Sequence, residues 1–162
     1  MDAALLPGDA VVSTVATDLR AVVSSVVDPE IPVLTIEDLG ILRSVEMDAG
    51  RVVVRITPTY SGCPAMRQIE DDITTVLARE GFEDVEVVVS HDEVWTTGWI
   101  TEQGSRKLEA FGIAPPGPMQ EVLCPRCAAG HPRLVARFGS TACKSLMVCS
   151  SCGEPFDHFK QF

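Results

Sequence analysis

Apolar residues recur near the start of the chain at the spacing of one helical face. From Val12 they follow one another every three or four residues as far as Val26, and Asp9 stands before them as a candidate N-cap. Asp28-Pro29 ends the pattern, because the residue before a proline avoids the α region and the proline ring blocks continuation. The pattern predicts a first helix that ends near Val27.

Short runs of β-branched residues come next, after a loop over residues 28–38. Residues 41–47 and 51–57 are joined by Asp48-Ala49-Gly50, whose composition suits a tight hairpin turn. Residues 85–89 are rich in valine and predict a third strand. We expect an antiparallel hairpin, and a third strand that lies parallel to one of its strands through a right-handed crossover.

The crossover is predicted to be a second helix that follows Pro64. Apolar residues from Met66 to Leu77 repeat with helical spacing, acidic residues fill the positions between them, and Gly81 supplies a C-terminal stop. Residues 101–111 predict one more short helix, although Gly104 weakens that pattern.

A segment rich in proline and glycine, Gly112 to Pro118, separates this unit from the rest of the chain. Three prolines and two glycines in seven residues favour a stiff, extended spacer. We therefore expect two domains, one over residues 1–113 and one over residues 119–162.

Composition and charge narrow the classes of function. An apolar content of 46% with 22% charged residues predicts a folded core. The net charge is -10 and is unevenly distributed. Residues 1–113 contain 20 acidic and 8 basic residues, whereas residues 114–162 contain 3 acidic and 5 basic ones. The acidic part would repel a phosphate backbone, so we expect no nucleic acid as partner. With neither a basic leader nor an apolar run of roughly 18–20 residues, we expect a cytoplasmic protein and no membrane contact.

Four of the six cysteines form two Cys-x2-Cys pairs separated by 21 residues: Cys124, Cys127, Cys149 and Cys152. Two such turns can close a tetrahedral shell of four sulfurs, for which zinc is the default ion and an iron centre the alternative. Paired disulfides fit a reducing compartment poorly, and His131 could replace one sulfur. So small a unit would need the metal to fold. For the whole chain the predicted fold class is therefore α+β, a helix–hairpin–helix–strand domain followed by a four-cysteine zinc ribbon.

The remaining two cysteines carry less specific patterns. Cys63 stands between a strand and the helix after Pro64, where free N–H groups and the helix dipole would lower the pKa of the thiol. A half-buried cysteine that merely caps the helix fits the same position, and a nucleophilic pair with His91 has no support. Cys143 is either a small buried thiol or a reactive, cluster-binding one.

Several of these motifs, in this order, resemble the small SufT-like and CIA-type iron–sulfur assembly family. They are Asp28-Pro-Glu-Ile-Pro32, Asp38-Leu-Gly-Ile41, the run from Thr57 to Pro64, and Trp95 after the third strand. The resemblance implies that Cys63 handles a transient iron–sulfur cluster, with Asp28, Glu30 and Thr59 as supporting loop residues.

The rest of the chain is similar to the PaaD family of phenylacetate catabolism. The similarity rests on Pro115-Pro116, the two Cys-x2-Cys pairs, the run from Phe138 to Ser145 and the run from Glu154 to Lys160. It implies an accessory or maturation factor of the phenylacetyl-CoA epoxidase, with the epoxidase components and especially its iron–sulfur reductase as partners. The implied factor is not itself an enzyme, and the sequence carries neither the Glu-x-x-His helices of a di-iron bundle nor a Gly-rich nucleotide loop.

Cluster handling by Cys63 needs further ligands, since a cluster usually takes about four. We expect Cys63 to work across a homodimer, with Cys143 or an exogenous thiol completing a labile site, and with the ribbon folded back to bring Cys143 near Cys63. Two alternatives stay open: an adaptor that docks the epoxidase or its reductase without binding a cluster, and a subunit that contributes directly to oxygenase activity.

Overall fold

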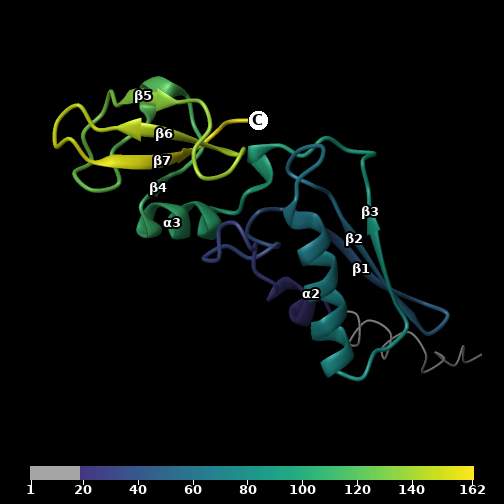
Figure 1. Ribbon diagram of the computed structural model, residues 1–162. Helices are drawn as coiled ribbons and strands as arrows, with labels where there is room; N and C mark the ends of the chain where they lie inside the picture. The colour runs from purple at the N-terminus through teal and green to yellow at the C-terminus, as the bar shows by residue number, and fades with distance from the viewer. Residues whose placement is uncertain (1–18) are drawn as a thin grey trace, which may run out of the picture.

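The computed structural model describes residues 19–162, which form two sheets with a helix beside each (Figure 1). The first sheet has the strand order β1-β2-β3 and the second the order β4-β7-β6-β5. The elements are, in chain order, β1 (Leu42–Asp48), β2 (Arg51–Ile56), α2 (Ala65–Arg79), β3 (Val85–Val89), the 3-10 turn η1 (Thr97–Trp99), α3 (Glu102–Phe111), β4 (Ile113–Ala114), the 3-10 turn η2 (Met119–Glu121), β5 (Arg133–Ala136), β6 (Lys144–Val148) and β7 (Pro155–Phe159).

The predicted first helix is helical over residues 19–24, while its predicted start at Asp9 lies outside the described residues. The helix ends three residues before the expected Val27, which instead forms an isolated bridge with Thr35. The hydroxyls of Ser24 and Ser25 donate to the carbonyls three residues earlier, and this local bonding competes with a further helical turn.

The hairpin and the crossover are confirmed. Strands β1 and β2 pair antiparallel, and both residues of their connecting loop, Ala49 and Gly50, have positive φ, as a tight hairpin turn requires. Strands β2 and β3 are parallel and are joined through α2 (Figure 1). Each large apolar side chain fully buried in this layer contributes about 1.5–3 kcal/mol. The residues that α2 and β2 bury are Ala65, Met66, Ile69, Ile73, Leu77, Val52, Val54 and Ile56.

Helix α3 is confirmed, and Gly104 has a positive role in it. The side chain of Thr101 caps the helix by accepting a hydrogen bond from the Gly104 N–H at 2.9 Å, and Gly112 ends it in the left-handed conformation. A Cβ on Gly104 would lie 2.9 Å from the carbonyl oxygen of Asp38, so glycine is what lets α3 approach the 35–38 loop.

The loops beside the second sheet carry the four paired cysteines, and we call this sheet with its loops the ribbon unit. Residues 19–111 form the first unit. Within the predicted spacer, Ile113 and Ala114 form β4 and pair with β7. The domain limits at residues 113 and 119 stay a prediction.

The two units share one hydrophobic core. Phe159 of the ribbon unit lies 6.1 Å, centroid to centroid, from the ring of Trp95, and both side chains are buried. Cys143 belongs to the same cluster. A second, much smaller cluster lies behind the paired cysteines and consists of Ala114, Val122, Cys124, Met147, Cys149 and Phe156. Within residues 19–162, none of the helices is both long and apolar enough to cross a membrane.

Candidate metal centre and thiol interface

The four paired cysteines converge on one point. Their sulfur atoms all lie within 4.8 Å of one another, with 3.8 Å between the sulfurs of Cys124 and Cys152 and 3.6 Å between those of Cys127 and Cys149. A tetrahedral shell with metal–sulfur bonds of about 2.3 Å has sulfur–sulfur edges of about 3.8 Å. The donor set and its spacing therefore fit one tetrahedral ion, and these four residues form a metal-binding site.

Two matching backbone turns place these sulfurs. After each pair a residue takes positive φ, Ala128 in the first turn and Gly153 in the second, and its N–H donates to the carbonyl of the first cysteine of the pair. The N–H groups of Cys152 and Ser151 point at the sulfur of Cys149, and these donors lower the pKa of that thiol to about 6 against the opposing effect of burial. His131 is not in the group of clustered ligands.

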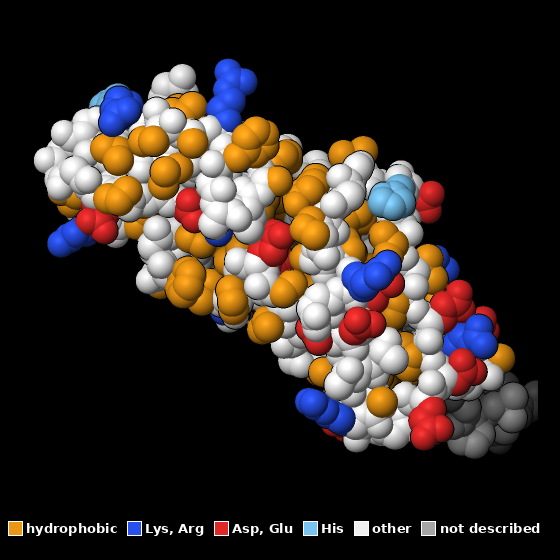
Figure 2. All heavy atoms as spheres, in the orientation of Figure 1, with side chains coloured by type: hydrophobic (Ala, Val, Ile, Leu, Met, Phe, Trp, Pro, Cys, Tyr) orange, Lys and Arg blue, Asp and Glu red, His pale blue; other side chains and the backbone are white. Residues whose placement is uncertain are grey.

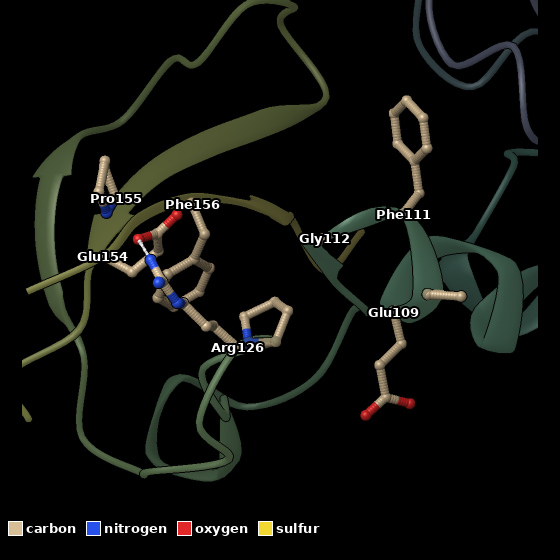
Figure 3. Close-up of a pocket in the computed structure, with 9 residues that line it drawn as sticks. Glu109, Phe111, Gly112, Arg126, Glu154, Pro155 and Phe156 are labelled. Carbon is tan, nitrogen blue, oxygen red and sulfur yellow. Dashed lines mark hydrogen bonds and ion pairs between the residues drawn. The ribbon is translucent and has the colours of Figure 1, made fainter. Parts of the chain in front are cut away.

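A hollow of about 280 Å³ beside the metal site lies between the end of α3 and the ribbon unit. Figure 3 shows Arg126 reaching Glu154 there, while Phe111 points away from both. The hollow holds no other charged pair among its lining residues. Because Arg126 belongs to the first cysteine turn and Glu154 follows the second, their ion pair links the two turns.

Cys63 lies in the loop before α2 and is half-buried. The N-cap of α2 is Pro64 and no side chain caps the helix, so the predicted capping position of Cys63 is wrong by one residue. The Ala65 N–H does act to lower the pKa of the Cys63 thiol, but the expected low pKa is also wrong. Burial raises the pKa of the Cys63 thiol, and the negative charges of Glu30 and Asp28 add to the effect. The helix N-terminus lowers the pKa of the thiol less than the rest of its surroundings raise it, because those surroundings are apolar or acidic.

Cys143 is buried at the join between the two units. Its sulfur lies 3.0 Å from the hydroxyl of Thr141, and burial raises the pKa of the thiol, with a further contribution from Glu30 and Asp28. Cys63 and Cys143 are 80 residues apart in sequence, yet the same two carboxylates act on both, and both thiols pack in one hydrophobic cluster. The ribbon unit is thus folded back toward the start of α2.

The two carboxylates sit in the loop that follows the first helix. Asp28 is buried and accepts hydrogen bonds from the N–H groups of Glu30 and Ile31, both at 2.8 Å. Burial raises the pKa of Asp28 and of Glu30, while the nearby Lys144 of the ribbon unit opposes the shift in each. Lys144 is itself buried and pairs with Asp157 at 3.3 Å.

Thr59 lines a hollow of about 150 Å³ together with Tyr60, His91, Glu93 and Val94. Its proposed support of Cys63 stays a prediction, and no described hydrogen bond joins Thr59 to either thiol within residues 19–162.

Sequence reasoning missed two participants. The hydroxyl of Tyr60 lies close enough to Cys63 to lower the pKa of that thiol, and burial together with both thiols raises the pKa of the hydroxyl itself. Lys144 is the buried cation opposite Asp28 and Glu30. Tyr60 lies three residues before Cys63 and Lys144 directly after Cys143, so position close to a candidate thiol was the available signal.

The charges divide between the units. Figure 2 shows acidic side chains gathered over the half of the molecule that holds the first unit, whereas hydrophobic side chains cover much of the ribbon half on this face. We call the region around Cys63 and Cys143, where the two units meet, the thiol interface. The acidic first unit supplies Asp28 and Glu30 to it.

The fold and the two cysteine sites define an iron–sulfur assembly domain joined to a metal-binding ribbon. Residues 16–89 match the family described as iron–sulfur cluster assembly protein, and residues 112–160 match the family described as the PaaD zinc beta ribbon domain. The chain belongs to the PaaD family. An Escherichia coli protein that is named as one of the subunits of 1,2-phenylacetyl-CoA epoxidase is 46% identical over 150 residues, which cover 88% of this chain and 91% of the relative.

Relatives of the first unit alone bear names from iron–sulfur maturation. "Fe-S protein maturation auxiliary factor SufT" of Staphylococcus aureus is 37% identical over 92 residues, 55% of this chain and 99% of the relative. A crystal structure of a domain of unknown function (DUF59) from Bacillus anthracis superimposes with a TM-score of 0.57 at 26% identity, covering 61% of this chain and 95% of that one. The resemblance found in the sequence is confirmed, as are the α+β fold and the ribbon.

Proposed function

We propose that this protein is a non-catalytic maturation factor that delivers or inserts an iron–sulfur cluster into the phenylacetyl-CoA epoxidase system. The observation that carries the proposal is that Cys63 and Cys143, one from each unit, pack in one hydrophobic cluster near the same two carboxylates, Asp28 and Glu30. The names of two kinds of relative support the proposal: one relative is named as a subunit of the epoxidase, and others are named as iron–sulfur maturation factors.

The residues of the thiol interface suit the reversible binding of a metal centre. Without a metal, both thiols are held protonated by burial and by two negative neighbours. An iron centre would reverse that balance, because its positive charge stabilises both thiolates and carboxylates at the same time. Two thiols are fewer than the usual number of cluster ligands, so the site would hold its cargo loosely.

Cys63 and Cys143 would bind the cargo, and Asp28 and Glu30 would balance its charge. Tyr60 would hold the Cys63 sulfur in place, and Lys144 would keep the carboxylates from repelling each other. A second copy of the chain, or an exogenous thiol, would supply the remaining ligands. Thr59 keeps its proposed role as a supporting loop residue.

In the ribbon unit we assign zinc as the ion of the four-sulfur site. A closed shell of four protein thiolates is typical of structural zinc, and the small cluster behind it buries few side chains. The ion would therefore hold the ribbon fold and with it the position of Cys143.

The partners we propose are the epoxidase components, first among them the reductase that carries an iron–sulfur cluster. The acidic first unit and the ribbon unit would both be available to such a partner, since their outer faces remain exposed.

The proposal is tested by anaerobic reconstitution of wild type and Cys63→Ser with ferrous iron and sulfide, followed by quantitation of iron, sulfide and zinc. We expect Cys63→Ser to lose about tenfold or more of its iron while zinc content and circular dichroism stay unchanged. The matched control is Ser61→Ala, an exposed change in the same loop that should leave iron loading intact.

One observation favours an adaptor as the second candidate. A half-buried and a buried thiol, both with raised pKa values, are also typical of inert structural cysteines. If the Cys63→Ser protein restored the cluster content of the co-expressed reductase as well as wild type does, the adaptor would replace the cluster carrier.

A further inference from the structure

A groove of about 500 Å³ lies on the ribbon unit, and none of the six cysteines is among its lining residues. We call it the ribbon groove. The residues that define it here are Met119, Leu134, Arg137, Phe138, His158 and Lys160. Three of them are large apolar side chains with much of their surface exposed, at 43% for Met119, 41% for Leu134 and 67% for Phe138.

A buried histidine with an unused ring nitrogen belongs to this face. Along β7 and β6 the side chains alternate, so His158 and Ser145 point to the same side of the sheet as Leu134 of β5. His158 is only 3% exposed; its Nδ1 lies 3.4 Å from the hydroxyl of Ser145, and its Nε2 has no partner among the described residues. The same hydroxyl donates to the His158 carbonyl at 3.4 Å, so Nδ1 shares Ser145 with the backbone while Nε2 is left as a buried polar atom without a described partner.

The cations around the groove are also without partners. Of the five basic residues in 114–162, Arg126 and Lys144 form ion pairs. Arg133, Arg137 and Lys160 have no carboxylate at salt-bridge distance among the described residues. The ammonium group of Lys160 instead lies 4.4 Å from the centre of the Phe138 ring. The ribbon groove thus combines apolar side chains with positive charges that no carboxylate of the described residues neutralises.

The groove runs beside an open sheet edge. Strand β5 is the outer strand of the order β4-β7-β6-β5, so one side of its backbone is unpaired within the sheet. Both Leu134 and Val135 are exposed, at 41% and 47%. Proteins usually protect such an edge with charges, prolines or a covering segment, and an extended peptide can add to one that is left open.

We propose that the ribbon groove binds an extended, acidic and apolar segment of a partner protein, which pairs with the free edge of β5. An apolar side chain of the segment would lie between Leu134 and Phe138. Its carboxylates would face Arg137 and Lys160.

A protein segment is favoured over a nucleic acid by the charge of the whole chain. The ribbon unit is fused to a unit with 20 acidic and 8 basic residues over positions 1–113, which would repel a phosphate backbone passing beyond the groove. Lys160 meets Cys143 only along the backbone, where its N–H donates to the Cys143 carbonyl at 2.9 Å. No described hydrogen bond joins a groove side chain to the sulfur of Cys63 or Cys143 within residues 19–162, so peptide binding would not require cluster handling.

The test is a selection of short random peptides displayed on phage, made on the full chain loaded with its ribbon metal. Selected peptides are then synthesised and titrated against variants. We expect them to be rich in acidic and apolar residues, and to bind Leu134→Asp and Lys160→Glu about tenfold or more weakly than wild type. Both positions are on the surface of the groove, so the variants should fold.

Matched controls are taken from the first unit, at positions that do not line the groove. Val94→Asp replaces an apolar side chain that is 84% exposed, and Arg79→Glu reverses an exposed charge at the end of α2; both should leave peptide affinity unchanged. Failure to select any peptide, selection of basic peptides, or equal affinity for Leu134→Asp and wild type would overturn the proposal. Saturable binding of hexanoate at the groove with no peptide selected would also overturn it, in favour of a small carboxylate.

Discussion

At the scale of single residues, Asp38 shows how one motif position ties distant segments together. Its carboxylate accepts hydrogen bonds from Lys107 Nζ at 2.6 Å and from the Thr35 N–H at 3.0 Å, and its carbonyl accepts from the Thr101 N–H at 2.9 Å. Asp38 is buried, which alone would raise its pKa, but the hydrogen bonds from Lys107 and Thr35 hold the pKa below its usual range. The ionised form therefore stabilises the position of α3.

We expect Asp38→Asn to lower the free energy of unfolding by about 1–3 kcal/mol at pH 7, because a charged hydrogen-bond acceptor is lost. A lowered folded-state pKa means that the stabilisation is present above the ordinary pKa of an aspartate and is lost as the pH falls through the folded value. Urea unfolding at a series of pH values should show the gap between variant and wild type closing below about pH 4. Asp71→Asn, an exposed change on α2, should show neither effect, and a gap that persisted in acid would contradict the assignment.

At the scale of elements, the ribbon unit depends on its ion more than on its core. The cluster behind the four sulfurs contains six residues, two of which are the metal ligands Cys124 and Cys149. So small a core cannot offset the conformational entropy of the loops around it. In contrast, the larger core, which α2 and strands β1 to β3 form together with Phe159 of β7, contains none of the four metal ligands.

Removal of the ion by a strong chelator should therefore unfold the ribbon unit and spare the first. We expect amide hydrogen exchange in β5 to β7 to lose its protection, while α2 and β1 to β3 keep theirs. Cys143→Ser serves as control, since its sulfur is outside the four-sulfur shell and its metal content should match wild type. Protection that survived in β6 after chelation would show that the ion is not what holds the sheet.

At the scale of the whole molecule, the two units are joined by aromatic side chains as well as by the chain itself. Trp95, whose indole N–H donates to the Leu39 carbonyl at 2.8 Å, contacts Phe159 and lies 6.2 Å from the ring of Phe162. This contact places Cys143 over the loop that carries Asp28 and Glu30. The proximity of Cys143 to the surroundings of Cys63 therefore depends on the contact between Trp95 and Phe159.

We expect Phe159→Ala to lower the free energy of unfolding by about 3–5 kcal/mol and to change Trp95 fluorescence, because the ring is 1% exposed and fills the join. Phe162→Ala is the matched control: its ring is 47% exposed, and its removal should cost under about 1 kcal/mol. Denaturant unfolding followed by fluorescence and by circular dichroism measures both. Equal losses for the two variants would mean that Phe159 does not join the units.

The local elements and the metal site could be predicted because their causes lie close together in sequence. Periodicity predicted the hairpin, α2, β3 and α3 nearly to the residue, and two Cys-x2-Cys turns suffice to aim four sulfurs at one ion. Gly104 was misjudged as a weak point of α3, because the Asp38 carbonyl it makes room for comes from another part of the chain.

The sequence by itself thus determined the elements, the ribbon and its four ligands, since each follows from short-range geometry. Tertiary structure alone decided that Cys143 meets the surroundings of Cys63, that Tyr60 and Lys144 join them, and that the pKa of Cys63 is raised instead of lowered. A pKa is set by burial and by all charges nearby, whichever segment supplies them. Those neighbours come from loops dozens of residues apart, and only packing brings them together.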